Sequence, residues 1–166
     1  FGLKDYQKKR FLTFLHPELD PTGAGWHARQ AIFAIGSGRL TGKGYLRGTQ
    51  NQLQFLPEHW TDFPFAVWAE EWGLLGCLLL LLCYLVLILW SIYLAHEARD
   101  RFARYMAIGC ASLLFWHVSI NIAMVIGMAP VVGVTLPLIS YGGSSLLTVM
   151  VVLGLLMNVS MRKYNY

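Results

Sequence analysis

Apolar residues follow one another in three long runs in the carboxy-terminal part of the chain. No Asp, Glu, Lys or Arg occurs between Trp72 and Ala95 or between Tyr105 and Met161. About 20 apolar residues cross a bilayer as a helix, so the pattern predicts membrane-spanning helices at 72–95, 105–126 and 144–160. We therefore expect an all-α fold, a polytopic bundle of membrane helices.

The connection between the second and third predicted spans is rich in glycine and proline. Residues 127–143 read GMAPVVGVTLPLISYGG and carry no charge. Pro130 and Pro137 remove amide donors and break helices, while Gly142 and Gly143 permit a sharp turn. Irregular backbone survives at membrane depth only where protein or a wet cavity surrounds it. We expect this connection to form a polar pocket at one face of the bundle.

Basic residues indicate how the bundle sits in the membrane. Five of them fall on the same side of the predicted spans: Arg99, Arg101, Arg104, Arg162 and Lys163. By the positive-inside rule that side is cytoplasmic. Residues 1–71 and the connection at 127–143 then lie outside, and 48–71 carries no Lys or Arg, as an outer flank should.

We expect residues 1–71 to form a large structured extracytoplasmic loop. Residues 3–15 place Leu3, Phe11, Phe14 and Leu15 on one face, which predicts a helix lying in the membrane interface. The cations of this helix suit anionic lipid headgroups. Seven glycines between positions 23 and 48 predict many turns, with a short helix at 26–35 between them.

Composition agrees with a membrane protein: 56% of the residues are hydrophobic and 13% are charged. The net charge of +4 is divided between two membrane faces and forms no basic stripe, which excludes nucleic-acid binding. The three cysteines lie in the apolar spans without a Cys-x-x-Cys pair and read as small hydrophobic residues. The chain begins with Phe and has no signal peptide, so we expect a carboxy-terminal piece of a larger membrane domain.

Polar residues gather immediately before the first span, in FLPEHWTDFPFAVWAEEWG. One interpretation is structural: Thr61 or Asp62 caps the helix that Pro64 begins, while Glu70 and Glu71 face water or headgroups. In the other, Asp62 stands at the rim of a pocket formed with 127–143 and acts as a general base. The pattern by itself favours the cap.

Other polar motifs give weaker signals. GSGRLTGKG at 36–44 fails as a phosphate loop because five residues separate its first glycine from Gly42, and Gly44 stands where Ser or Thr should follow Lys43. Lys43 is read either as a solvated side chain or as a point charge for a phosphate. The five histidines lack metal-ligand spacing, so no zinc site is expected. His117 and Asn121 share one helix face and should pack against protein.

Several separated motifs resemble the carboxy-terminal half of the SEDS family (FtsW/RodA/SpoVE). They are FLHPELDPTGAGWHARQ, AIGSGRLTGKGYLRGTQ, FLPEHWTDF, AEEWG and GMAPVVGVTLPLISYGGSS, and GTQNQLQFLPE is most similar to the RodA members. The resemblance implies a bundle of about ten helices in the complete protein. It also implies a peptidoglycan glycosyltransferase of the bacterial cytoplasmic membrane, polymerising lipid II into glycan strands for cell elongation and rod shape, with a class B penicillin-binding protein as partner.

Carried over by position, the essential aspartate of the family falls on Asp62. The implied reaction is inverting: a sugar 4-hydroxyl, deprotonated by Asp62, attacks the anomeric carbon of an undecaprenyl-diphosphate-linked sugar. Lys43 and a divalent cation such as Mg²⁺ are both candidates to meet the diphosphate, and such a cation needs no dedicated protein cage. The other candidate substrate-binding residues are Gln50, Glu58, His59, Thr61, Tyr141, Gly142, Gly143 and Ser144, the last three through backbone amides.

The chain departs from the family pattern at Arg39, Trp60 and Pro64. Two other classes of function stay open. A transporter (flippase) of lipid-linked precursors would place its decisive polar groups near the bilayer midplane. A non-catalytic scaffold for a penicillin-binding protein would tolerate any substitution at Asp62.

Overall fold

The computed structural model describes residues 24–45 and 62–162, and those residues form four α-helices without a strand. The helices are α2 (Ala24–Ser37), α4 (Pro64–Glu97), α5 (Arg101–Val125) and α6 (Gly143–Arg162). The all-α fold predicted from the sequence is confirmed, and α2 covers the short helix expected at 26–35. The interfacial helix predicted at 3–15 lies outside the described residues.

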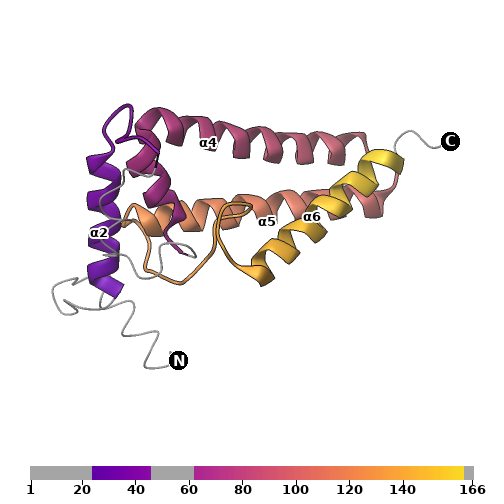
Figure 1. Ribbon diagram of the computed structural model, residues 1–166. Coiled ribbons are helices and arrows are strands. Elements are labelled where there is room, and N and C mark those ends of the chain that lie inside the picture. Colours follow the sequence, from indigo (N-terminus) through magenta and orange to yellow (C-terminus); the bar gives the residue numbers. More distant parts are fainter. Residues whose placement is uncertain (1–23, 46–61, 163–166) are drawn as a thin grey trace, which may run out of the picture.

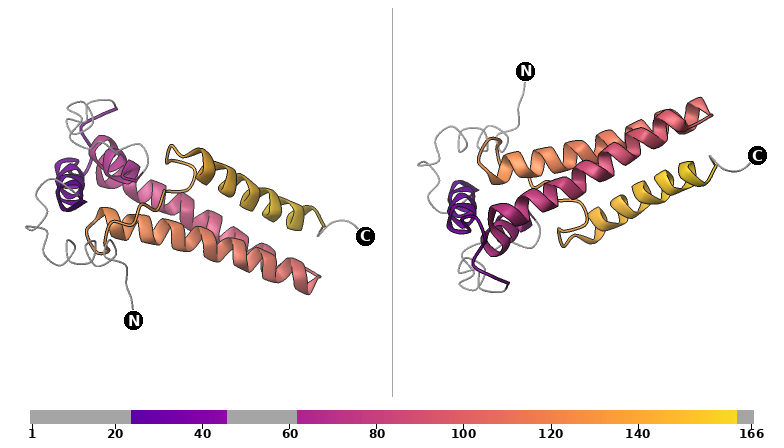
Figure 2. Two further views of the ribbon diagram at one scale, coloured as in Figure 1. Left: turned by 90° about the horizontal axis from the view of Figure 1, so that it is seen from below. Right: turned by 90° about the horizontal axis from the view of Figure 1, so that it is seen from above.

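Three of these helices, α4, α5 and α6, are long and apolar enough to cross a membrane. α4 and α5 lie side by side, and α2 stands across their ends (Figure 1). α6 runs beside this pair in the two views of Figure 2, and in Figure 1 it approaches the pair near its own carboxy-terminal end and diverges from it toward its start. The α4–α5 turn and the end of α6 therefore lie at the end of the bundle opposite to α2 (Figure 1).

Two clusters of buried side chains hold the helices together. At the α2 end, alanines of α2 and of the first turns of α4 allow close approach to α5, with Phe63, Met124 and Leu136 filling the centre. At the opposite end, Leu94, Leu114 and Leu156 bring α4, α5 and α6 into contact. Most of the exposed side chains of α4 are leucines and other apolar residues, which a lipid surrounding tolerates because hydrocarbon is as apolar as they are.

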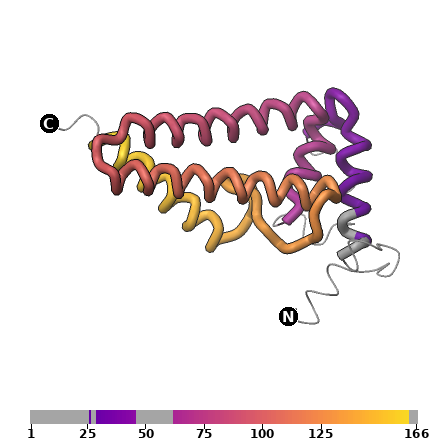
Figure 3. Tube along the Cα trace, turned by 180° about the vertical axis from the view of Figure 1, so that it is seen from behind, coloured from indigo at the N-terminus to yellow at the C-terminus, as the bar shows by residue number. Residues whose placement is uncertain are grey.

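α4 is broken at Gly73, which has φ 64° and ψ −162°. These angles are accessible essentially to glycine alone. The segment before Gly73 turns away from the long segment after it (Figure 3). The predicted boundary between loop and first span at 71/72 therefore lies beside this break, while the helix itself begins earlier, at Pro64.

The loop after α2 inserts into the break. Four backbone hydrogen bonds join the two: Lys43 N to Glu70 O (3.0 Å), Gly44 N to Glu71 O (3.0 Å), Leu74 N to Arg39 O (2.9 Å) and Leu75 N to Leu40 O (3.2 Å). In an unbroken helix the last two amides would donate to the carbonyls of residues 70 and 71. Two helix hydrogen bonds are therefore lost at the break, and the loop forms four in their place. The carbonyls of Glu70 and Glu71 and the amides of Leu74 and Leu75 all keep a hydrogen-bond partner.

The connection between α5 and α6 folds back into the bundle. Leu136 and Pro137 are buried, and the hydroxyl of Tyr84 donates to the carbonyl of Pro137. Tyr84 lies about 16 Å along α4 from Gly73, at 1.5 Å per residue. The irregular backbone therefore reaches well inside the span and is surrounded by protein there, as its composition predicted.

The predicted spans at 72–95 and 144–160 lie within α4 and α6, and the span at 105–126 ends one residue beyond α5. The eight residues at 64–71, assigned from the sequence to the outer loop, are helical in the structure. Pro64 explains this early start, because its fixed φ suits the first position of a helix.

Candidate functional site

Asp62 lies immediately before α4, at the α2 end of the bundle, and is partly buried. The N-cap position of α4 falls on Phe63, which provides no side-chain cap hydrogen bond. Phe63 is instead an apolar anchor with 2% of its surface exposed. The cap position thus falls one residue after Asp62, and Thr61 lies outside the described residues.

Asn121 of α5 joins Asp62 to the glycine- and proline-rich connection. Its Nδ2 donates to the backbone carbonyl of Asp62 at 3.1 Å and to that of Val134 at 2.6 Å. Asn121 is completely buried. The expectation that this residue packs against protein is confirmed, while its two acceptors were not foreseen.

The carboxylate of Asp62 lies against Gly133. A Cβ atom placed on Gly133 would stand 3.4 Å from Oδ2 of Asp62, and Gly133 has φ 76°. A side chain at this position would thus be strained by the backbone, and its Cβ would lie in van der Waals contact with the carboxylate. The structure therefore brings Asp62 and the connection together.

Lys43 forms an ion pair with Glu70, its Nζ lying 2.6 Å from Oε1. The side chain of Lys43 is 31% exposed and that of Glu70 is fully buried. Glu71 is also buried, with 8% of its surface exposed. The expectation that both glutamates face water or headgroups is wrong, because the inserted loop covers this side of α4.

The turn at residues 141–144 has local hydrogen bonds. The amide of Gly142 donates to the carbonyl of Ser140, and the carbonyl of Gly142 accepts from Ser145 Oγ and Leu146 N. Gly143 and Ser144 begin α6, where helix amides have no intrahelical acceptor. Of the three amides predicted to be available to a ligand, that of Gly142 is already used. Tyr141 is 83% exposed.

The other candidate residues, Gln50, Glu58, His59 and Thr61, lie outside the described residues. Within 24–45 and 62–162 no group of three His, Cys, Asp or Glu side chains is placed to hold a metal ion. Mg²⁺ does not need such a group, because one or two carboxylates can hold it together with the phosphates of a substrate and water.

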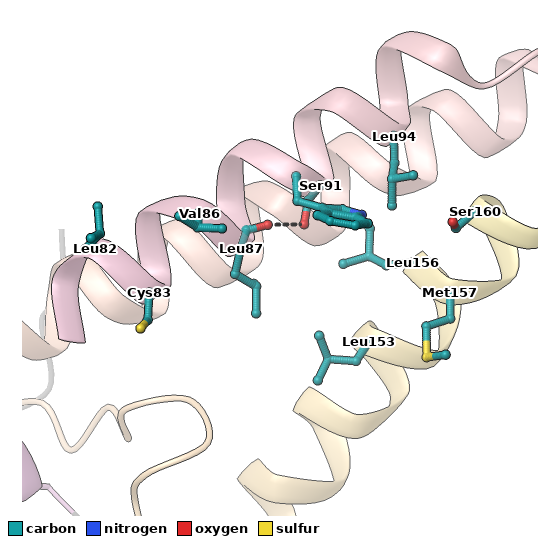
Figure 4. A pocket seen from close by; sticks show the side chains of 11 residues that line it. Leu82, Cys83, Val86, Leu87, Ser91, Leu94, Leu153, Leu156, Met157 and Ser160 are labelled. Carbon is teal, nitrogen blue, oxygen red and sulfur yellow. Dashed lines mark hydrogen bonds between the residues drawn. The ribbon is translucent and has the colours of Figure 1, made fainter. Parts of the chain in front are cut away.

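A large groove separates α4 from α6 (Figure 4). It has a volume of about 710 Å³ and is lined by apolar side chains such as Val86, Leu87, Leu153 and Met157, with Ser91 as one of few polar residues. The hydroxyl of Ser91 donates to the carbonyl of Leu87 in its own helix. The groove suits hydrocarbon, and it offers the reacting groups of a sugar or diphosphate almost nothing to bind.

Comparison with known proteins assigns the chain to a family. The family model described as cell cycle protein, FtsW/RodA/SpoVE, matches residues 1–165. The chain belongs to the FtsW/RodA/SpoVE family. It is 53% identical over 159 residues to the Escherichia coli peptidoglycan glycosyltransferase MrdB, covering 96% of this chain and 43% of that protein. It is 42% identical to the Treponema pallidum peptidoglycan glycosyltransferase RodA, covering 97% of this chain and 37% of that protein. The chain thus spans about two fifths of the length of these FtsW/RodA/SpoVE proteins.

Solved structures support the same family. A chain of a peptidoglycan synthase complex that coordinates polymerization and crosslinking matches 99% of this chain, with a TM-score of 0.76 and 34% identity, and 44% of that chain is covered. An aspartate-to-alanine mutant of the Thermus thermophilus rod shape determining protein RodA matches 76% of this chain, with a TM-score of 0.63 and 37% identity, and 40% of that chain is covered. The FtsW/RodA/SpoVE fold is therefore present in this chain.

Asn121 and Gly133 complete the site through contacts with Asp62 that the sequence pattern did not reveal. Asn121 and Asp62 are far apart in the sequence, so no local spacing links them. A polar residue within an apolar span does indicate an inward-facing position, and this signal was available for Asn121. Gly133 looks like any other glycine of the connection until its φ is known.

Proposed function

We propose that this chain is the carboxy-terminal part of a peptidoglycan glycosyltransferase that polymerises lipid II, with Asp62 as the general base. The observation that carries the proposal is the position of the Asp62 carboxylate against Gly133, where irregular backbone enters the bundle. The names of the most similar relatives supply the reaction class. A class B penicillin-binding protein that cross-links the new strands completes the proposed assembly.

Asp62 is placed by this proposal on the outer side of the bacterial cytoplasmic membrane. Arg99, Arg101 and Arg162 lie at the α4–α5 turn and the end of α6, opposite to α2 and Asp62. An excess of positive charge favours the cytoplasmic side. Lipid-linked sugars presented on the outer leaflet would then meet the end of the bundle that carries Asp62.

The proposed chemistry is an inverting transfer. Asp62 accepts the proton of a sugar 4-hydroxyl as its oxygen attacks the anomeric carbon of the donor, and the undecaprenyl diphosphate leaves from the opposite face. Charge develops on that diphosphate and needs compensation. Because Glu70 already balances the charge of Lys43, the amides of Gly143 and Ser144 carry more of this role in the proposal.

A divalent cation fits the same place. One carboxylate together with diphosphate oxygens and water is a donor set that Mg²⁺ accepts. The ion would supply positive charge near the leaving group, whereas Asp62 would still orient and deprotonate the attacking hydroxyl. The apolar flanks of α4, α5 and α6 would contact the hydrocarbon tail of the lipid.

Neither rival class is favoured by the described residues. A transporter for lipid-linked precursors should carry its decisive polar groups near the midplane, while Asp62 lies before the first turn of α4 at one end of the bundle. A scaffold for a penicillin-binding protein would not require the contact between the Asp62 carboxylate and Gly133.

The test is lipid II polymerisation by the complete purified protein carrying Asp62→Asn. Asparagine keeps the shape of the side chain and loses the proton acceptor, so we expect the rate to fall about 100-fold to 10000-fold. Membrane abundance, partner binding and thermal stability should stay near wild type. Asp100→Asn is the matched control, because Asp100 is exposed and precedes α5 at the opposite end of the bundle. Near-normal polymerisation by Asp62→Asn would refute the assignment of the base.

A further inference from the structure

Asn121 uses both hydrogens of one amide group to hold two separate pieces of backbone. Its Nδ2 is 3.1 Å from the carbonyl oxygen of Asp62 and 2.6 Å from that of Val134. The reverse orientation of the amide would set its oxygen against both carbonyl oxygens, so the donor group must face them. Asn121 thus joins α5, the start of α4 and the glycine- and proline-rich connection at a single point.

Both acceptors are carbonyls in irregular backbone. Asp62 precedes the first turn of α4 and Val134 lies between α5 and α6, so both carbonyls belong to segments outside the helices. Both bonds are partly buried, and a carbonyl that loses its donor in such a place costs free energy. Asn121 therefore determines where these two segments can lie.

The other polar atom of the Asn121 side chain, Oδ1, lacks a hydrogen bond to the described residues, so the side chain is oriented for the two bonds that Nδ2 donates. Within the part of the chain that the structure describes, Oδ1 is buried and has no hydrogen-bond partner. A buried acceptor without a donor lowers stability. Its presence in a completely buried side chain is understandable if the two bonds made by Nδ2 are what the position requires.

The second acceptor, the carbonyl of Val134, lies next to Gly133, the residue in contact with the Asp62 carboxylate, which we call the Gly133 wall. Val134 follows Gly133, the residue against which the carboxylate of Asp62 rests. One amide group therefore fixes the main chain of Asp62 on one side and the residue adjoining Gly133 on the other. The position of the carboxylate relative to that wall depends on both bonds.

We propose that Asn121 is a positioning residue that holds Asp62 and the Gly133 wall in the arrangement required for proton transfer. This inference rests on the proposed function, in which Asp62 is the base. A displacement of about 1 Å at a reacting group can lower a rate by about 100-fold. Asn121 makes no contact with substrate in this proposal and acts through Asp62 alone.

The test compares Asn121→Ser with wild type in the complete protein. Serine has one hydroxyl hydrogen and can hold one of the two carbonyls, so the fold should persist while the arrangement loosens. We expect kcat for lipid II polymerisation to fall about 10-fold to 100-fold, with KM for lipid II changed less than about 2-fold, because binding does not depend on the base. Ser112→Ala on the exposed face of α5 is the control, since Ser112 bonds only within its own helix in the described contacts, and it should behave as wild type.

A double variant separates positioning from a general structural role. In the Asp62→Asn background, residual turnover is followed at high enzyme concentration, and adding Asn121→Ser should lower it less than about 2-fold, because residues that act as one unit are not additive. An equal loss in both backgrounds, or a loss of membrane abundance with unchanged specific activity, would overturn the inference and make Asn121 structural. Normal activity of Asp62→Asn alone would instead remove the proposed base, an outcome distinct from both. Asn121→Leu, which abolishes both bonds at similar volume, should reduce kcat further than Asn121→Ser if it folds.

Discussion

Lys43 holds Glu70 twice: its ammonium lies 2.6 Å from Oε1 of Glu70, and its backbone amide donates to the Glu70 carbonyl at 3.0 Å. The first bond neutralises a carboxylate that is completely buried, and the second satisfies a carbonyl released by the break at Gly73. The loop at 38–45 therefore stabilises the first turns of α4, which follow Asp62, and Lys43 has a structural role through both bonds.

Lys43→Met should destabilise the protein. It removes the cation beside a buried carboxylate, and we expect a loss of about 2 kcal/mol, below the usual cost of breaking a buried pair because Lys43 is partly exposed. Thermal unfolding of the purified protein in detergent measures this. The double variant Lys43→Met with Glu70→Gln removes both charges and should be more stable than Lys43→Met alone.

The same pair of variants tests whether Lys43 also meets the diphosphate. If its role is only to pair with Glu70, the double variant should recover polymerisation activity together with stability. Recovery of stability without activity would show a direct role in catalysis. A Lys43→Met protein that is as stable as wild type would contradict the importance of the buried pair.

Gly73→Ala should be severely destabilising. Alanine does not adopt φ 64° and ψ −162° without strain, and its Cβ would lie 2.8 Å from the carbonyl oxygen of Leu40. We expect a loss of at least about 2 kcal/mol in thermal unfolding or a large drop in membrane abundance. Gly109→Ala in α5 is the control: no atom lies within 4 Å of its added Cβ, so stability should change by at most about 1 kcal/mol.

Much of the architecture could be predicted from charge and periodicity. A bilayer excludes unpaired charges, so long uncharged apolar runs identify α4, α5 and α6 almost regardless of detail. The irregular connection at 127–143 was also predictable, because proline and glycine break helices wherever they occur. Both signals follow from the residue types themselves: their hydrophobicity decides whether they can face lipid, and proline and glycine restrict or free the backbone wherever they stand.

The orientation of single side chains could not be predicted in the same way. Glu70 and Glu71 look like the outer turn of a helix, and only the loop that inserts at Gly73 makes them buried. The contact of Asn121 with Asp62 depends on how two distant segments pack. From the sequence, Gly142 and Gly143 were expected to make the sharp turn, whereas the positive φ values of the connection fall at Gly127, Gly133 and Leu138.

The orientation of the bundle can be tested with single cysteines, in a background where the three native cysteines are replaced. Tyr45 and Asp100 are both exposed, and they lie near α2 and at the α4–α5 turn, at opposite ends of the bundle (Figure 1). An impermeant thiol reagent added outside intact cells should modify a cysteine at Tyr45 and spare one at Asp100. The reverse labelling would place Asp62 on the cytoplasmic side and contradict polymerisation outside the membrane.

Gly133→Ala should impair catalysis beyond its effect on folding. The added Cβ would stand 3.4 Å from Oδ2 of Asp62, at a position with φ 76°. The backbone strain alone costs about 1–2 kcal/mol, and relief of that strain should displace the segment that contacts the carboxylate, so we expect kcat to fall by about 10-fold in the folded protein. Lipid II polymerisation per amount of folded protein, with thermal unfolding measured alongside, separates the two effects.

Two other glycines serve as controls. Gly127 of the same connection has φ 79° and its added Cβ would meet a side-chain carbon of Ile32, so Gly127→Ala should show the strain while its folded fraction polymerises normally. Gly154 of α6 has open space around its Cβ position and no positive φ, so Gly154→Ala should be close to wild type in both measurements. If Gly127→Ala and Gly133→Ala lose activity in equal proportion to stability, the connection acts only through folding. A specific loss at Gly133, by contrast, locates the catalytic requirement at its contact with Asp62.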